Sequence, residues 1–371
     1  MIVDLIVDLF AGPGGLDMAA RGLGVPVIGL EWDADACATR RAAGLPTVEG
    51  DVTKFGPADF PEADVLAGGP PCQTYSAAGS GAGRAQLDLV LDLVRRMGAR
   101  ESVTRALAGL SDPRTALALE PLRWTLAALD SGRPYRAVVL EQVPQVLPVW
   151  EAYAEVLRAE GYGVAAGVLR AEEHGAPQTR RRAVLIARHG LPAALPEPTH
   201  RRYLKGVPQV AGDPALLPWV SQDDVLHIGP FEAVSNYGTG GDPRARGRRT
   251  HEEPAATVTG KISRVRLVRD GSDLPRLTPG QAGLLQGFPP DYPWRGADIS
   301  QQIGNAVPVA LGRAVLAAAL GLGPVACNEI RRCVAPGCAK PIVPRAGRGR
   351  PARHCSGACR VRAHRAAKAV A

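Results

Sequence analysis

Hydrophobic residues in the first half of the chain form short Val-, Ile- and Leu-rich runs separated by longer stretches with helical spacing. This alternation is typical of an α/β protein with a parallel sheet. Apolar positions 87, 90, 91, 94 and 97 predict a helix over Gln86–Met97, and similar spacing predicts helices over Trp150–Ala159 and Val307–Leu320. The runs themselves predict strands at Ile2–Leu9, Val25–Leu30, Val65–Gly68, Ala137–Leu140 and Ala183–Ala187.

The pattern changes at about residue 190, where prolines, arginines and short hydrophobic pieces replace the periodic elements until about residue 275. We therefore expect a main domain over residues 1–190, completed by residues 276–325, with an irregular insert over 191–275. A Gly/Pro break at Gly321–Pro324 then separates a tail, residues 326–371, that is rich in Cys and Arg.

Composition and charge narrow the class of protein. No apolar run approaches the roughly 20 residues of a membrane span, so we expect no membrane partner. Seven cysteines, four of them in the last forty residues, do not resemble a secreted disulfide framework and favour the cytoplasm. Residues 328–371 hold eleven Lys and Arg against one acid, which leaves 33 basic and 35 acidic residues elsewhere. The tail, and the locally basic stretches Arg180–Lys205 and Arg244–Arg269, are candidate polyanion contacts.

A glycine-rich turn follows the first predicted strand, in the segment Asp8–Asp17 with Gly12, Gly14 and Gly15. Such a turn between strand and helix lets a ligand approach the backbone, although its spacing is not that of a dinucleotide site. Glu31 at the end of the second strand suits ribose hydroxyls, Trp32 could stack on adenine, and Asp51 could accept from an adenine amino group. Together these features indicate a cofactor that contains adenosine.

Cys72 lies in a Gly/Pro loop, Gly68–Ser76, directly after a predicted strand. A lone cysteine is most often a small buried hydrophobe, but this setting favours a nucleophile. Carbon 5 of cytosine, unlike an exocyclic amine, is not nucleophilic until a group such as a thiolate adds at carbon 6. The loop therefore fits covalent attack on cytosine.

Acidic and basic side chains follow two further strands. Glu141 ends an apolar strand, at the edge of the sheet where α/β proteins bind ligands, and could protonate the ring nitrogen 3 of a cytosine. Arg180 and Arg182 precede another strand, and alternation places them on one face, where they could hold the pyrimidine oxygen and a phosphate.

In this order, the motifs resemble the DNA cytosine-5 methyltransferase family over residues 1–190 and 276–320. The segments that carry the resemblance are DLFAGPGGLD, Glu31-Trp32, GDV at 50–52, GGPPCQTYS, LEQVP, QTRRR, RLTPGQAGLLQGFP and QQIGNAVP. One departure is Gln142, where the family usually has Asn. The family implies a Rossmann-like class I methyltransferase sheet that uses S-adenosylmethionine and carries an inserted target-recognition domain, residues 191–275.

The resemblance implies catalytic roles for Cys72 as the nucleophile, Glu141 as the acid, and Arg180 and Arg182 as base-positioning residues. It implies sequence-specific action on double-stranded DNA. We also expect a monomer; a separate restriction endonuclease is an open further partner, because nothing in the chain itself indicates one. A tRNA-directed relative and an inactive DNA-binding relative are the alternatives. It further implies a cofactor pocket formed by Phe10, Gly12, Gly14, Gly15, Glu31, Trp32, Asp51, Pro70, Leu117 and Asn305.

The tail contains two close cysteine pairs, Cys333 with Cys338 and Cys355 with Cys359. Four thiolates in this spacing suit a structural zinc ion, and the stretch RHCSGACRVRAHR resembles small basic treble-clef zinc modules. A disordered basic tail and a redox-sensitive thiol cluster are the other interpretations.

Overall fold

The computed structural model of the chain describes residues 5–71, 81–108, 114–235, 246–323 and 358–361. The contacts divide the chain into two compact units, Met1–Val325 and Ala326–Ala371. The first unit holds all the strands named below and every predicted residue outside the tail. Cys72 lies outside the described residues.

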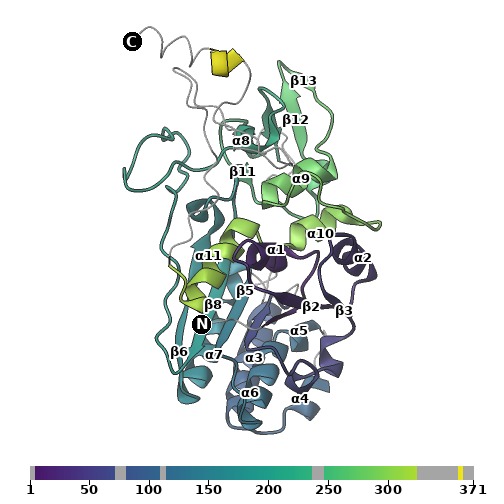
Figure 1. The fold of residues 1–371 in the computed structure, drawn as a ribbon, viewed down its shortest axis with the longest axis vertical. Helices are drawn as coiled ribbons and strands as arrows, with labels where there is room; N and C mark the ends of the chain where they lie inside the picture. The colour runs from purple at the N-terminus through teal and green to yellow at the C-terminus, as the bar shows by residue number, and fades with distance from the viewer. Residues whose placement is uncertain (1–4, 72–80, 109–113, 236–245, 324–357, 362–371) are drawn as a thin grey trace. The chain divides into compact units, whose positions relative to one another are not determined.

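The main sheet of the first unit contains seven strands in the order β3-β2-β1-β4-β5-β8-β6 (Figure 1). Its first five strands are parallel, while β8 is antiparallel to both β5 and β6. The strands are β1 Ile6–Leu9, β2 Val27–Glu31, β3 Thr47–Glu49, β4 Val65–Gly68, β5 Ala137–Gln142, β6 Tyr162–Arg170 and β8 Arg181–His189.

Each of the five predicted strands has a counterpart, although residues 2–4 of the first prediction lie outside the described residues. The expectation of a parallel sheet is wrong for Ala183–Ala187, which lies in β8. The connection from β6 to β8 spans only residues 171–180. A parallel pair needs a crossover of a dozen residues or more, so a connection this short returns the chain antiparallel. Strands β3 and β6 were not predicted, because β3 has three residues and β6 contains Gly163 and Gly167 in place of a clear apolar alternation.

Alternation along the strands supplies a hydrophobic core on each face of the sheet. Ile6, Val65 and Ala137 lie in one buried cluster, and the next residue of each strand lies in the other. Helices α1 (Gly15–Arg21) and α11 (Val309–Leu320) belong to the first cluster, as does α9 (Pro279–Gln286). The second includes α3 (Gly81–Gly98), α6 (Glu120–Asp130) and α7 (Leu147–Ala159). Helices α3, α7 and α11 confirm the three predicted helices.

Shorter helices complete the unit. They are α2 Ala34–Ala42, α4 Thr104–Ala108, α5 Arg114–Leu117, α8 Asp223–Leu226 and α10 Ile299–Asn305, with 3-10 turns at Val52–Lys54, Pro57–Asp59, Pro144–Val146, Ala171–His174 and Ile262–Arg264.

A smaller four-stranded antiparallel sheet, in the order β10-β9-β12-β13, forms within the 191–275 region. Its strands are β9 Glu232–Val234, β10 Arg248–Thr250, β12 Arg266–Arg269 and β13 Ser272–Asp273. The region joins the rest of the unit through β11 (Ala255–Ala256), which pairs in parallel with β7 (Gln178–Thr179). This pairing places the region next to the segment that carries Arg180 and Arg182.

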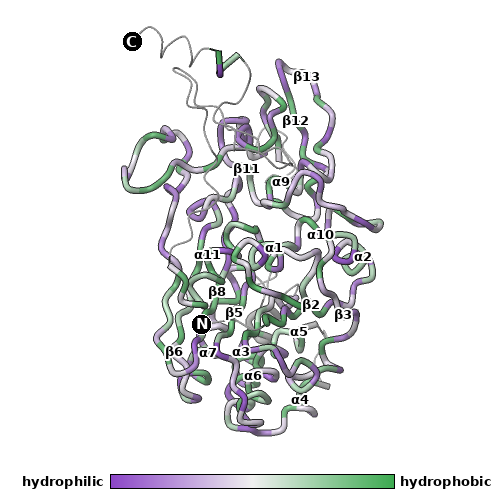
Figure 2. Tube along the Cα trace, viewed as in Figure 1, coloured by the Kyte–Doolittle hydropathy of each residue, from purple (hydrophilic) through white to green (hydrophobic). Residues whose placement is uncertain are grey.

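The stretch Ile299–Leu320 is long and apolar enough to cross a membrane by length and composition alone, and 67% of its most apolar window is buried in the protein. It comprises α10 and α11, whose apolar side chains pack into the core; Figure 2 shows the hydrophobic colouring of α11 and of the central strands. Burial against the sheet accounts for its hydrophobicity.

Candidate active site

The sheet order brings the predicted residues to one edge. Strands β2, β1, β4 and β5 are neighbours and run in the same direction, so their carboxyl ends lie together. Glu31 ends β2, Phe10 follows β1, Gly69 and Pro70 follow β4, and Glu141 is near the end of β5. This is the edge at which open α/β sheets bind ligands.

The glycine-rich turn takes its shape from left-handed backbone. Phe10 has φ of 59° and Gly12 has φ of 53°, a region that glycine enters without the cost paid by other residues. Gly15 serves close packing instead, since a Cβ there would lie 2.4 Å from the carbonyl oxygen of Val307. The chain just beyond Asn305 therefore lies against the turn.

The Glu31 carboxylate holds the turn in place. Its Oε2 accepts from the backbone N–H of Gly12 at 2.7 Å, and its Oε1 accepts from those of Trp32 and Asp33, each at 2.8 Å. A carboxylate has roughly four lone-pair sites, so three backbone bonds leave room for a ligand hydroxyl. Trp32, beside it, is 72% exposed, so the face of its indole ring is open to solvent.

The remaining predicted cofactor residues lie on the surrounding elements. Asp51 accepts from the N–H of Thr53, and the preceding Gly50 donates to the carbonyl of Glu31 at 2.8 Å. Leu117 packs against the same hydrophobic cluster as Phe10. Asn305 is exposed at the end of α10, where its side chain accepts from Gln301.

Glu141 is 8% exposed and faces two partners. Its Oε1 lies 2.8 Å from Nε of Arg182, although the N–H does not align as a hydrogen bond, so the contact is an ion pair. Its Oε2 points toward Gly69, where an added Cβ would be 3.7 Å away. The absence of a side chain at Gly69 keeps the space beside this carboxylate open.

The loop that leads to Cys72 is tied to the strand that carries Glu141. The Gln142 amide donates to the carbonyl of Pro70 at 2.5 Å, and its oxygen accepts from the N–H of Val143. The departure from the usual Asn thus supplies a direct link between the two segments. Sequence reasoning identified the substitution but not this contact, which joins residues 72 positions apart.

Arg180 is buried and holds backbone. Its two terminal nitrogens donate to the carbonyls of Val258 and Gly304, at 2.5 and 2.9 Å. Burial lowers the pKa of Arg180 to about 9, so it stays charged at neutral pH, and Arg182 and Glu141 are its charged neighbours. Arg180 therefore links the 191–275 region and the segment before Asn305 to the site, while Arg182 reaches Glu141.

The sequence did not predict a buried ion pair that lies next to the glycine-rich turn. Arg40 of α2 binds Asp17 of α1 with contacts of 2.6 and 2.8 Å and also donates to the carbonyl of Ala11. Burial, and then the neighbouring Asp17 carboxylate, raise the pKa of Asp8 well above its usual value. Nothing in the sequence of α2 distinguished Arg40 from the neighbouring Arg41 for this role.

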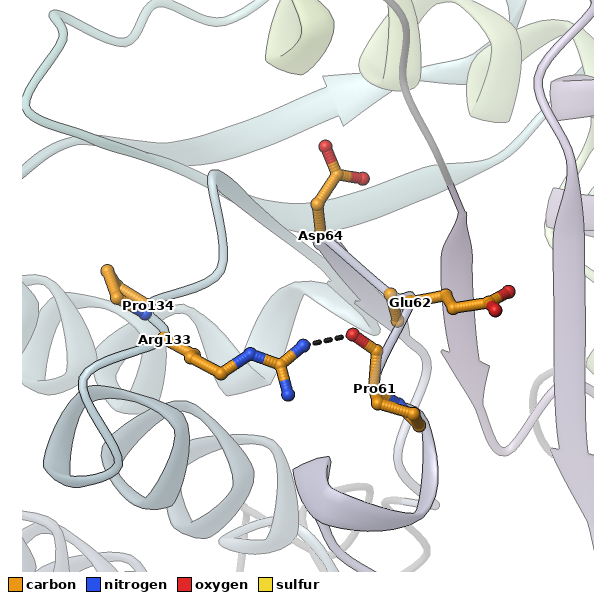
Figure 3. A pocket seen from close by; sticks show the side chains of 6 residues that line it. Pro61, Glu62, Asp64, Arg133 and Pro134 are labelled. Atoms are coloured by element: carbon orange, nitrogen blue, oxygen red, sulfur yellow. Dashed lines mark hydrogen bonds between the residues drawn. The ribbon is translucent and has the colours of Figure 1, made fainter.

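A hollow of about 390 Å³ lies at the opposite edge of the sheet (Figure 3). Its lining residues precede β4 and β5, and Arg133 donates to the carbonyl of Pro61 across it. Because ligands of this architecture bind at the carboxyl edge, we do not assign the reaction to this hollow.

In the tail, Cys359 is buried and lies in a short helical turn at 358–361, while Cys333, Cys338 and Cys355 lie outside the described residues. Among the residues that the structure describes, no group of three or more potential ligands could hold a metal ion.

The sequence matches the family model of the C-5 cytosine-specific DNA methylases over residues 5–101. The type II methyltransferase M1.HphI of Haemophilus parahaemolyticus is 28% identical over 354 residues, which cover 85% of this chain and 86% of the relative. M.NlaX of Neisseria lactamica, also a type II methyltransferase, is 29% identical, with 84% and 94% covered.

Solved structures show the same fold at lower identity. Dnmt2 methyltransferase of S. pombe is 15% identical, with a TM-score of 0.55 over 85% of this chain and 98% of that one. Entamoeba histolytica methyltransferase EhMeth is 12% identical, with a TM-score of 0.55 over 86% and 98%. The family model, the type II relatives and the ordered motifs around one sheet edge together make this chain similar to the C-5 cytosine-specific DNA methylases, and they support that family for it.

Proposed function

We propose that this chain transfers a methyl group from S-adenosylmethionine to carbon 5 of cytosine within a specific sequence of double-stranded DNA, with Cys72 as the nucleophile. The observation that carries the proposal is the placement of the Glu141–Arg182 pair beside the Gly69–Pro70 loop that leads to Cys72, at the sheet edge that also holds the Glu31 turn. A base held by Glu141 and Arg182 would then lie next to a cofactor held at the Glu31 turn.

The residues of the turn fit S-adenosylmethionine. Glu31 keeps acceptor capacity for ribose hydroxyls, exposed Trp32 offers a stacking surface for adenine, and Gly12 leaves its backbone uncovered, since a Cβ there would meet nothing within 4 Å. When bound, S-adenosylmethionine supplies a methyl group on a positively charged sulfur, which an activated carbon 5 can accept.

The chain's own residues activate that carbon. The target base first leaves the duplex stack, which costs a few kcal/mol. The Cys72 thiolate forms a bond to carbon 6, and the displaced electron pair moves toward nitrogen 3, where Glu141 supplies a proton and accepts from the amino group. Arg182 stabilises the carboxylate that remains. After methylation, loss of the carbon-5 proton restores the 5,6 double bond and expels the Cys72 thiolate, and nitrogen 3 returns its proton to Glu141.

We assign sequence recognition to residues 191–275. Arg248 and Arg249 lie on β10 of their small sheet, and Arg246 precedes it. Guanidinium groups bind guanine edges or phosphates, and Arg248 and Arg249 would exchange their contacts with Glu232 and Tyr203 for such a ligand. The pairing of β11 with β7 joins this region directly to the catalytic arginines.

The experiment that tests this function is methylation of duplex DNA by the purified protein, read by bisulfite sequencing. We expect 5-methylcytosine at one short sequence, and exchange of residues 191–275 for those of a relative with another target should move the methylated site. The exchange tests recognition separately from chemistry, because Cys72, Glu141 and Arg182 remain.

In that assay, transfer RNA serves as a parallel substrate and buffer alone serves as the control. Methylation of tRNA in place of DNA would support the tRNA-directed alternative, and cofactor binding without any transfer would support the inactive relative. If the protein with exchanged residues 191–275 still methylates the original DNA sequence, recognition does not reside in this region.

For the tail we propose a zinc-stapled clamp that adds DNA affinity without sequence information. Residues 328–371 have eleven basic side chains and little apolar material, so a metal held by Cys333, Cys338, Cys355 and Cys359 would have to supply the folding free energy. The basic side chains would neutralise phosphates and release counterions.

Deleting residues 328–371 should weaken DNA binding most at low salt and flatten the dependence of log affinity on log salt, with the methylated sequence unchanged. Fluorescence anisotropy across a salt series measures this slope, and elemental analysis of the full chain measures zinc. Well under one zinc per chain would rule out the staple, and an unaltered slope would rule out the clamp.

We further propose that the protein acts in the cytoplasm, since its substrate is DNA, and that it is a monomer. A separate restriction endonuclease would cleave the same sequence when it is unmodified. Light scattering at assay concentration checks the monomer, and a dimer mass would overturn it.

A further inference from the structure

A hollow of about 510 Å³ lies where the 191–275 region meets the end of β6. Several separate segments line it, among them the end of β6 with the following 3-10 turn, the start of the region, and β10. The residues that matter for its chemistry are Arg170, Glu172, Tyr203, Lys205, Arg248 and Arg249.

Four of these side chains are cationic, and two of them are already engaged. Arg248 pairs with Glu232, and Arg249 stacks on the Tyr203 ring at 4.4 Å. Arg170 and Lys205 form no ion pair with another described residue. The hollow therefore holds two positive charges that are available to an anion.

Glu172 provides an independent sign of a ligand. It is 1% exposed, it lines the hollow, and its Oε2 has no hydrogen-bond partner. A buried polar atom without a partner costs about 1–3 kcal/mol, so a polar group that entered the hollow and completed the bonding of this oxygen would be stabilised.

The hollow adjoins the segment that leads from β7 to β8 and carries Arg180 and Arg182. Thr179 of β7 and Ala256 of β11 line it and pair with each other. Thr179 is followed along the chain by Arg180, Arg181 and Arg182. Arg182 contacts Glu141, and the exposed Arg181 pairs in register with Arg170. A group in this hollow would lie close to the strand that positions the target base.

We infer that this hollow binds a backbone phosphate of the DNA duplex, with Arg170 and Lys205 as its cationic contacts and the Glu172 carboxyl as a hydrogen-bond donor to a phosphate oxygen. The inference rests on the proposed action on DNA and adds a specific anchoring site to it. Only the protonated Glu172 can donate, because an ionised carboxylate only accepts and would repel the phosphate.

Protonation of Glu172 is accessible near neutral pH, since burial raises its pKa to about 7. The buried histidines nearby, His174 and His200, have pKa values lowered to about 4 by burial and do not titrate in this range. The charged groups that surround Glu172 from the packed elements are Arg170, Glu173, Arg202, Lys205, Arg248, Arg249 and Glu253.

A bound phosphate should raise the pKa of Glu172 further, because it favours the protonated form. Affinity is then full below pH 7 and falls as pH rises through the pKa of the free protein, by up to about tenfold per pH unit for one proton. We expect the fall in DNA affinity between pH 7 and 8.5 to come from this residue.

The test measures anisotropy of a labelled duplex with the full-length protein, without cofactor, from pH 6 to 8.5. Glu172→Gln keeps a neutral donor at every pH, so it should remove the pH dependence and bind more tightly than the natural chain at pH 8.5. Arg170→Gln with Lys205→Gln should weaken binding to all sequences and lower the salt slope by about 1.

Arg105→Gln, an exposed substitution on α4, is the matched control and should leave affinity, pH dependence and salt slope unchanged. A Glu172→Gln protein that binds more weakly at every pH and loses sequence preference would overturn the inference, since the carboxylate would then accept from a base amino group. Unchanged binding in the Arg170/Lys205 variant would also overturn it. Failure of the natural chain to bind DNA at all would instead contradict the proposed function.

Discussion

Replacing Cys72 by serine is expected to lower methyl transfer to DNA by about 10⁴-fold or more, as removal of the nucleophile does in other covalent enzymes. A serine hydroxyl is far less ionised than a thiol at neutral pH and is a poorer leaving group, so both addition at carbon 6 and final release are impaired. Transfer of labelled methyl groups to a duplex measures the loss.

A duplex with 5-fluorocytosine at the target isolates the covalent step. Fluorine at carbon 5 cannot leave as the proton does, so the natural protein should remain bound to the DNA on a denaturing gel. The Cys72→Ser protein should bind the duplex but form no such adduct. An adduct with this variant would remove Cys72 from the role of nucleophile.

Cys37 supplies the matched control. It is buried on α2, its thiol donates to the carbonyl of Glu31, and burial raises its pKa to about 11, so it remains a protonated, unreactive thiol. Cys37→Ala should still form the adduct, after correction for any loss of folded protein. This comparison separates loss of the nucleophile from loss of a cysteine in general.

The second large effect is expected from Glu141→Gln, which should lower turnover by about 10²–10⁴-fold, the range for a general acid. The amide can still contact the base but cannot supply a proton to nitrogen 3. Single-turnover methylation, measured per folded molecule at saturating DNA and cofactor, reports this step.

Stability must be measured beside turnover, because the substitution also leaves Arg182 without its anionic partner at a site where both side chains are about one-tenth exposed. We expect a lower melting temperature, since an uncompensated buried charge is costly. Asp64→Asn, which removes the ion pair with Arg136 at the opposite sheet edge, provides the comparison. Equal turnover per folded molecule in the two variants would make Glu141 a structural residue.

Local patterns were sufficient for much of the fold and for the chemistry. Short apolar runs predicted β1, β2, β4, β5 and β8, because a strand buried on both faces needs apolar residues regardless of its neighbours. Helical spacing likewise predicted α3, α7 and α11. The loop of Cys72 and the strand end of Glu141 could be recognised because each needs a particular residue type within a few positions.

Only the tertiary structure decided which segments meet. The direction of β8 follows from its short connection to β6, and the contact of Gln142 with Pro70 and the pairing of Arg40 with Asp17 join residues far apart in the chain. The hollow around Glu172 likewise requires several separate segments to converge. Periodicity reports the burial of one segment, whereas such contacts depend on strand order and packing, which no single segment encodes.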